Sequence, residues 1–299
     1  MSKFIISADS SSDCIKSYLE MNNVYCFVMK RVLNGREIGQ IYETPQDFDN
    51  FYDELKKGAL PTTTQINSYE AEEYFADVLQ KEKEGDIIHI ALSGGLSGTC
   101  DNCRAAAEKL SAEIKGRKIY VVDSLIATGG IEMLIDRLIP MRENDIKAEE
   151  AVKRIGEIRD RQQGWFVVDD LFHLKRGGRI SGFKAAIGAL LNIKPVVTVS
   201  KSGRLAIENT VKGTRKAIKY LINKIEELGV DVLREEFFKN PVYLIRTSKN
   251  ENYDELKREF LNKYPDAVIK ETIIGPIVGT HVGGGAAAVI FEGSKRLDI

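Results

Sequence analysis

Short apolar runs alternate with longer amphipathic stretches along the first half of the chain. The runs Phe4–Ala8, Ile87–Leu92 and Ile119–Asp123 have the length of strands, and each is followed by apolar positions at helical spacing. Strands that alternate with helices in this way are typical of a mostly parallel, doubly wound sheet. The first half is therefore predicted to be an α/β domain.

The second half has a different pattern, in which hairpins are mixed with helices. Strands predicted at Pro195–Val199 and Leu205–Asn209 flank a Lys-Ser-Gly turn, and helices are predicted at Phe183–Leu191 and Thr214–Leu228. This mixture favours an α+β domain. Because a charged stretch, Arg142–Lys153, separates the two patterns, we expect domains at residues 1–150 and 151–299.

The turn after the strand Ile87–Leu92 combines glycines with hydroxyl side chains. It reads Ser-Gly-Gly-Leu-Ser-Gly-Thr from Ser93 to Thr99, directly before a predicted helix. Free amides at a helix N-terminus bind anions, but neither nucleotide-binding glycine fingerprint is present, and no G-x-S-x-G motif surrounds Ser93 or Ser97. An anion site, a plain turn with a capping serine and a serine nucleophile all remain open.

Polar residues also follow the other two predicted strands of the first half. Asp9-Ser10 and Asp123-Ser124 come at strand ends, and ligands of open parallel sheets bind at that edge. These residues either cap the following helices or bind a ligand. A stand-alone phosphoryl-transfer or hydrolytic enzyme that uses Asp9 and Asp123 is the alternative function, although the D-x-D spacing of phospho-aspartate enzymes is absent.

Histidines and a basic loop supply further candidates. His281 lies in a glycine-rich segment, where backbone can approach another group closely, whereas His89 and His173 lie in apolar stretches and are expected in the core. The loop Lys175–Arg179 is either a solvated loop or a docking surface for an acidic partner or a phosphate.

Composition narrows the classes of function. Lysine and arginine number 43 against 44 acidic residues, so the basic excess of a nucleic-acid-binding protein is absent. Apolar runs stay below the roughly 18 residues of a membrane span, and the first residues lack a secretory pattern. We therefore expect a cytoplasmic protein with no stable membrane insertion and reduced cysteines. The pair Cys100 and Cys103 lacks two further zinc ligands, so we expect structural thiols and no metal site.

Taken in order, several short motifs resemble those of the DegV family of bacterial fatty-acid-binding proteins. They span nearly the whole chain: Asp9-Ser10, Pro61-x-Thr63-Thr64-Gln65, Ser93-Gly94-Gly95-Leu96-Ser97-Gly98-Thr99, Val122-Asp123-Ser124, Leu174–Ile180, Leu191–Pro195 and Gly279-Thr280-His281. The chain departs from the family pattern at several positions, among them Gly94, where a second serine is usual.

The resemblance implies a long-chain fatty acid in a tunnel between two domains, with no further cofactor and no catalytic residue. The carboxylate would be held by Thr63, Ser93, the Gly94 turn and His281. Possible secondary contacts are Ser10, Thr62, Ser97 and Ser124, and the sequence leaves open which of Thr62, Thr63 and Thr64 faces the ligand. Several relatives present the acid to a separate ATP-dependent kinase subunit, which implies docking through Arg176 and Arg179. The apolar segment Ala185–Leu191 is a candidate for the tunnel wall.

Overall fold

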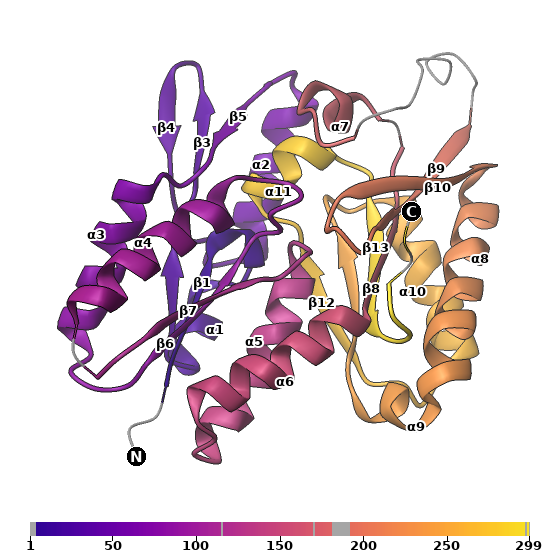
Figure 1. Ribbon diagram of the computed structural model, residues 1–299. Coiled ribbons are helices and arrows are strands. Elements are labelled where there is room, and N and C mark those ends of the chain that lie inside the picture. Colours follow the sequence, from indigo (N-terminus) through magenta and orange to yellow (C-terminus); the bar gives the residue numbers. More distant parts are fainter. Residues whose placement is uncertain (1–3, 115, 170, 181–191, 297, 299) are drawn as a thin grey trace.

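The computed structural model describes residues 4–298 with the exception of 115, 170, 181–191 and 297. The molecule is layered (Figure 1). From one side to the other, a group of helices is followed by a first sheet, a second group of helices, a second sheet and a third group of helices. The predicted helix Phe183–Leu191 and the predicted tunnel wall Ala185–Leu191 lie outside the described residues.

The first sheet has four parallel strands in the order β2-β1-β6-β7. Their bounds are Val24–Phe27, Ile5–Asp9, Ile87–Ala91 and Ile119–Asp123. Because successive side chains of a strand point to opposite faces, Ile5 and Ile87 pack in a different core cluster from Ile6 and Ile88. Both faces are buried, as expected for a parallel sheet covered by helices.

Helices cover the two faces of this sheet. On one face lie α3 (Ser68–Lys81) and α4 (Thr99–Glu113). On the other lie α1 (Lys16–Met21), α5 (Gly129–Glu143) and α6 (Ala148–Arg161). The core around α5 also contains side chains of the second sheet, such as Tyr243 and Ile290. Helix α5 therefore joins the two halves through one shared core.

The second sheet has six strands in the order β10-β9-β8-β13-β11-β12. Their bounds are Leu205–Lys212, Ile193–Val199, Gln162–Val167, Ala287–Glu292, Val242–Arg246 and Ile269–Ile273. Only β11 and β12 pair in parallel. The outer face packs against α8 (Thr214–Ile225), α9 (Asp231–Lys239) and α10 (Glu251–Lys263), and a π-helical turn, Glu226–Val230, joins α8 to α9.

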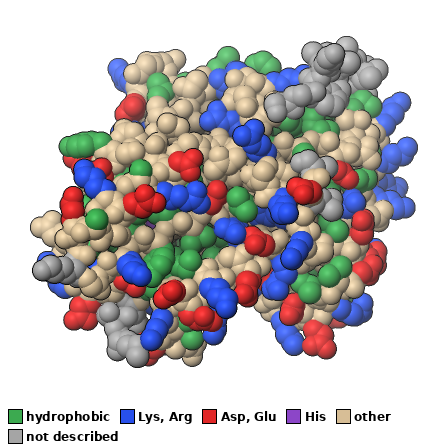
Figure 2. Space-filling model, viewed as in Figure 1, with side chains coloured by type: hydrophobic (Ala, Val, Ile, Leu, Met, Phe, Trp, Pro, Cys, Tyr) green, Lys and Arg blue, Asp and Glu red, His purple; other side chains and the backbone are tan. Residues whose placement is uncertain are grey.

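Smaller elements close the space between the two sheets at one end of the molecule. A three-stranded sheet consists of β4 (Arg36–Ile38), β3 (Lys30–Leu33) and β5 (Thr62–Thr64), with α2 (Pro45–Lys56) between β4 and β5 in sequence. Two short helices, α7 (Phe172–Arg176) and α11 (Pro276–Val282), lie beside it (Figure 1). Figure 2 shows basic and acidic side chains interspersed over one face of the molecule, in keeping with the nearly balanced charge.

The predicted α/β fold, with a parallel sheet followed by a second mixed domain, is confirmed. No strand pairs across residue 150 within the described part of the chain, which supports our proposal of a domain boundary there. Ser10–Ser12 forms a 3₁₀ turn before the short helix α1, and Thr62–Thr64 pairs with β3 as a strand.

The glycine-rich segment near His281 forms the short helix α11, which the sequence reading did not predict. Pro276 begins this helix at its first turn, where proline is favoured. Gly283 ends it with φ 76°, a conformation that glycine adopts at little cost. His281 therefore lies in the last turn of a helix, with its position fixed by the helix backbone.

Candidate functional site

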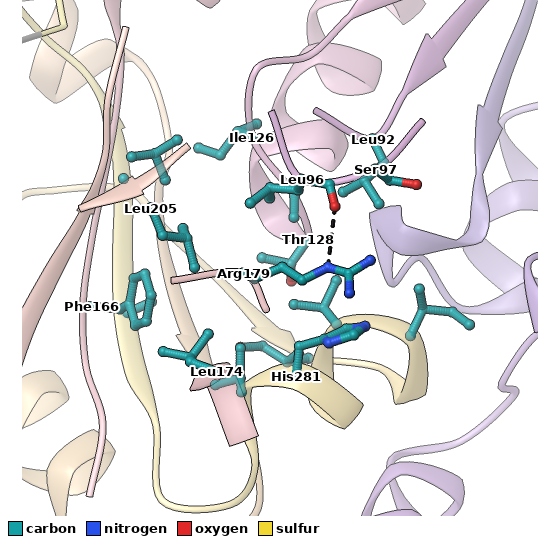
Figure 3. A pocket seen from close by; sticks show the side chains of 18 of the residues that line it. Leu92, Leu96, Ser97, Ile126, Thr128, Phe166, Leu174, Arg179, Leu205 and His281 are labelled. Carbon is teal, nitrogen blue, oxygen red and sulfur yellow. Dashed lines mark hydrogen bonds between the residues drawn. The ribbon is translucent and has the colours of Figure 1, made fainter. Parts of the chain in front are cut away.

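A mostly apolar cavity lies between the two sheets, and residues of β5, α7 and α11 line part of it (Figure 3). The space between its atoms is about 930 Å³, including the part that opens to solvent. Both halves of the chain contribute to its wall. The apolar lining includes Leu92, Ile126, Trp165, Phe166, Val199, Leu205, Ala288 and Ile290.

Polar side chains gather at one end of this cavity. Thr63 on β5 lies 2.8 Å from the ring of His281 on α11, measured from Oγ1 to Nε2. Thr64, Gln65, Ser97 and Arg179 line the same cavity. Figure 3 shows the Arg179 side chain between Leu96 and His281, on the side opposite Phe166 and Leu205. The cavity thus has an apolar body and one polar end, which is the arrangement that an amphipathic ligand requires.

The imidazole of His281 is held neutral. Burial, followed by the charges of Arg179 and Arg176, lowers the pKa of His281 to about 4. Its Nδ1 atom is buried and has no hydrogen-bond partner among the described residues. Because buried N–H groups are left unpaired less often than acceptors, this favours the tautomer that carries its proton on Nε2. In that tautomer Nε2–H donates to Thr63 Oγ1, and the Thr63 hydroxyl is free to donate to a ligand.

Two arginines surround this end, and both contact backbone carbonyls. Arg176 donates to the carbonyls of Pro61, at 2.9 Å, and Thr280, at 3.4 Å. Arg179 donates to the carbonyls of Leu96, at 3.2 Å, and Gly177. Among the described residues neither arginine forms an ion pair with a carboxylate, and burial lowers the pKa of Arg179. An uncompensated guanidinium at a partly buried cavity end favours an anionic ligand group.

The turn from Ser93 to Thr99 contributes to the cavity through its second half. Ser97 lines the cavity, and its hydroxyl accepts from the amide of Thr99 at the start of α4. Ser93 is fully buried outside the cavity lining, and its hydroxyl donates to the carbonyl of Gly203 at 2.8 Å. The exposed Gly94 donates its amide to Asp123. Thr63, His281, Ser97 and Arg179 thus line one cavity, whereas Ser93 and Gly94 do not line it.

Of the secondary candidates, Ser97 lines the cavity, whereas Ser10, Thr62 and Ser124 do not. Ser10 accepts from the amide of Met29, and the buried Ser124 donates to the carbonyl of Ile126. Thr62 is exposed, whereas Thr63 and Thr64 line the cavity, and Thr63 contacts His281 there. Arg176 is exposed and does not line the cavity.

Asp9 and Asp123, the residues of the alternative function, hold loops in place. Asp9 is 0% exposed, and its two carboxylate oxygens accept from Ser11 and from the amide of Leu92. Asp123 accepts from the amides of Gly94 and Leu125. Neither carboxylate lines the cavity.

Thr128 is a cavity residue that the sequence reading missed. It precedes α5 and lines the cavity with φ 53°, an uncommon conformation for a β-branched residue. The signal in the sequence was Thr128-Gly129-Gly130 directly before a helical pattern, which is typical of a helix N-terminus.

His89, Cys100 and Cys103 are buried and do not line the cavity. His89 is fully buried and lies 2.9 Å from the Ser7 hydroxyl, and burial lowers its pKa to about 3. Cys100 and Cys103 are free thiols inside α4, and burial raises the pKa of Cys100 to about 12. No cluster of three metal-ligating side chains occurs within the described ranges. Among the helices that the structure describes, none combines the length and apolarity needed to cross a bilayer.

Comparison with known proteins places this architecture in a family. The model of the DegV family, described as uncharacterised proteins, matches residues 3–294. A DegV domain-containing protein of Clostridium perfringens is 32% identical over 300 residues, covering 99% of each chain. A DegV lipid-binding protein of Thermotoga maritima has 26% identity and a TM-score of 0.79, with 99% of this chain and 100% of that chain covered.

A second solved structure from Thermotoga maritima, described as revealing a fatty-acid-binding function, has 25% identity and a TM-score of 0.77. It covers 99% of this chain and 100% of its own. The family match over nearly the whole length confirms the resemblance seen in the sequence motifs, and the chain belongs to the DegV family.

Proposed function

We propose that this protein binds a long-chain fatty acid, with the tail in the apolar body of the cavity and the carboxylate at its polar end. The observation that carries the proposal is a largely apolar cavity in which Thr63 hydrogen-bonds His281 and which Ser97 and Arg179 also line. The fatty-acid-binding and lipid-binding relatives of the same fold support it.

The tail supplies most of the affinity. At about 0.8 kcal/mol per buried methylene, the roughly 14 methylenes of palmitate contribute about 11 kcal/mol before ordering costs are subtracted. The carboxylate then needs partners, because burying it without them is costly. The Thr63 hydroxyl, the charge of Arg179 and the N-terminal end of α4 near Ser97 offer those partners.

Ser93 and Gly94, the other contacts that the family resemblance implies, take a different part in this proposal. The Ser93 hydroxyl has a single proton, which it gives to the carbonyl of Gly203. Ser93 reaches a carboxylate only if that hydrogen bond is exchanged, so in our proposal Thr63 makes the direct contact and His281 orients its hydroxyl.

The second part of the proposal is that the bound acid is presented to a separate kinase subunit in the cytoplasm. It rests on the family resemblance and on the absence of a nucleotide-binding fingerprint from the sequence. Loaded protein with ATP and Mg²⁺ should form acyl phosphate, detected by mass spectrometry, only after the kinase subunit is added. Acyl phosphate formed by the pure protein would instead favour the alternative enzyme, against which the loop-holding contacts of Asp9 and Asp123 argue.

The binding proposal is tested first by mass spectrometry of a denaturing organic extract of the purified protein, in which a co-purified long-chain acid is expected. Delipidated protein is then titrated with palmitate and oleate. Weaker than micromolar binding of both acids, with no acid in the extract, would refute the proposal.

Thr63→Val removes the hydroxyl while keeping the shape of the side chain. It should weaken binding about 10- to 100-fold, because a hydrogen bond to a charged group contributes about 1.5–3 kcal/mol. Thr62→Val on the same strand is the matched control, since Thr62 is exposed and outside the cavity. Equal affinities of the two variants would exclude Thr63 as a carboxylate contact.

A further inference from the structure

The short helices α7 and α11 pack against each other through two histidine–glycine contacts. Each helix ends at a glycine, Gly177 for α7 and Gly283 for α11, and each carries a histidine. A Cβ atom added at Gly177 would lie 2.1 Å from Nδ1 of His281, and one added at Gly283 would lie 2.4 Å from Cδ2 of His173. Each imidazole therefore lies against the glycine that ends the opposite helix.

Position 177 requires glycine because a side chain would not fit there, and not because of its backbone conformation. Its φ is −77° with ψ −7°, a region that alanine adopts freely. The added Cβ would also lie 3.1 Å from Cε1 and 3.2 Å from Cγ of His281, so the whole ring edge occupies the position of the missing side chain. The neighbouring Gly178 shows the opposite case, with φ 69° and no atom within 4 Å of an added Cβ.

The two arginines of the same loop fix this contact from both sides. Arg176 binds the carbonyl of Thr280, the residue directly before His281, and the carbonyl of Pro61, next to β5. Arg179 binds the carbonyls of Gly177 and Leu96. The loop from Arg176 to Arg179 thus connects α11, the start of β5 and the turn before α4, which are the segments that carry His281, Thr63 and Ser97.

We propose that Gly177 is a positioning residue of the polar end of the cavity: the missing side chain lets the His281 ring lie on the end of α7 and reach Thr63. The segment Arg176–Arg179 accordingly forms the wall behind His281, a role distinct from docking a partner. The consequence for ligand affinity rests on the proposed fatty-acid binding, whereas the consequence for the His281 ring does not.

The test compares Gly177→Ala with Gly178→Ala in the full chain. Gly177→Ala should displace the His281 ring from Thr63 and bring its pKa from about 4 toward the ordinary value as the ring gains solvent. Gly178→Ala should lower Tm, because alanine is strained at φ 69°, and leave the His281 signals unchanged. Histidine signals in a ¹⁵N-detected NMR titration, together with thermal unfolding, distinguish the two results. Unchanged His281 signals in Gly177→Ala would overturn the proposal.

Ligand affinity gives a second, independent measurement. Gly177→Ala should weaken palmitate binding at least 10-fold in the natural background and have less than a 2-fold effect in a His281→Ala background, where the added methyl group meets no ring. An equally large loss of palmitate affinity in both backgrounds would show a general structural effect and overturn the proposal. If the natural protein binds no fatty acid, the proposed function fails, while the NMR comparison still decides the role of Gly177.

Discussion

A buried carboxyl group beside the cavity predicts an unusual dependence of stability on pH. Asp13 is 7% exposed, and neither of its oxygens makes a hydrogen bond of good geometry among the described residues. Burial raises its pKa from 3.8 to about 8, although the nearby Thr128 hydroxyl and Gly275 amide act in the opposite direction. The negative charges of Glu132 and Asp9 add to the rise.

The sign of the effect follows from proton binding. Between pH 4 and pH 8 the folded protein keeps the proton on Asp13 and the unfolded chain has lost it. Stability contributed by this group therefore falls as the pH rises, by about 1.4 kcal/mol per pH unit. Over the range from pH 5 to pH 8 the loss approaches roughly 3–4 kcal/mol, a large fraction of the stability of an ordinary domain.

Asp13→Asn removes the ionisation and keeps the backbone, since asparagine tolerates the φ of 60° found at this position. In urea unfolding, the stability of the variant relative to the natural protein should rise from pH 5 to pH 8 by that amount. Asp145→Asn is the matched control, because Asp145 is exposed and also has a positive φ, of 54°. A stability difference for Asp13→Asn that stays constant across this range would refute the protonated Asp13.

Two further predictions concern other buried contacts. Gly203→Ala should destabilise the protein by about 1–3 kcal/mol more than Gly58→Ala, as measured by urea unfolding. Both positions have positive φ, but a Cβ added at Gly203 would lie 2.2 Å from Ser93 Oγ, whereas one added at Gly58 would have no atom within 4 Å. Equal losses of stability in the two variants would show that Ser93 can move aside with no loss of stability. Cys100 and Cys103 should react with a thiol reagent only after unfolding, because both are buried and burial raises their pKa; rapid labelling of the folded protein would contradict this.

Much of the fold could be predicted from periodicity alone. The strands of the first sheet are continuous apolar runs, and the hairpin at Asn34-Gly35 follows from residues that accept positive φ, here 52° and 74°. Helix α11 could not be predicted in this way, because seven residues with Gly279 inside carry little helical propensity. Its packing between α2, α7 and β5 stabilises it, and such tertiary contacts leave no local pattern.

The candidate site was predictable in its residue types but not in its orientations. The glycine-rich turn left an anion site among the open alternatives, and the family resemblance added Thr63 and His281; Thr63, Ser97 and His281 line one cavity. Ser93 illustrates the limit of the sequence. Its partner, Gly203, lies in the turn between β9 and β10, 110 residues away along the chain, so no local signal could show that this hydroxyl is already engaged.

The position of β13 has a consequence for the order in which the chain acquires structure during synthesis. This strand, residues 287–292, lies between β8 and β11 in the middle of the second sheet. The strands of the first sheet are all complete by residue 123, so that sheet can assemble early on the ribosome. Until residue 292 has been made, β8 and β11 each expose an unpaired edge that can capture another nascent chain. The cavity therefore cannot form completely until this late strand has been made. Chaperones can bind the exposed strand edges during that interval.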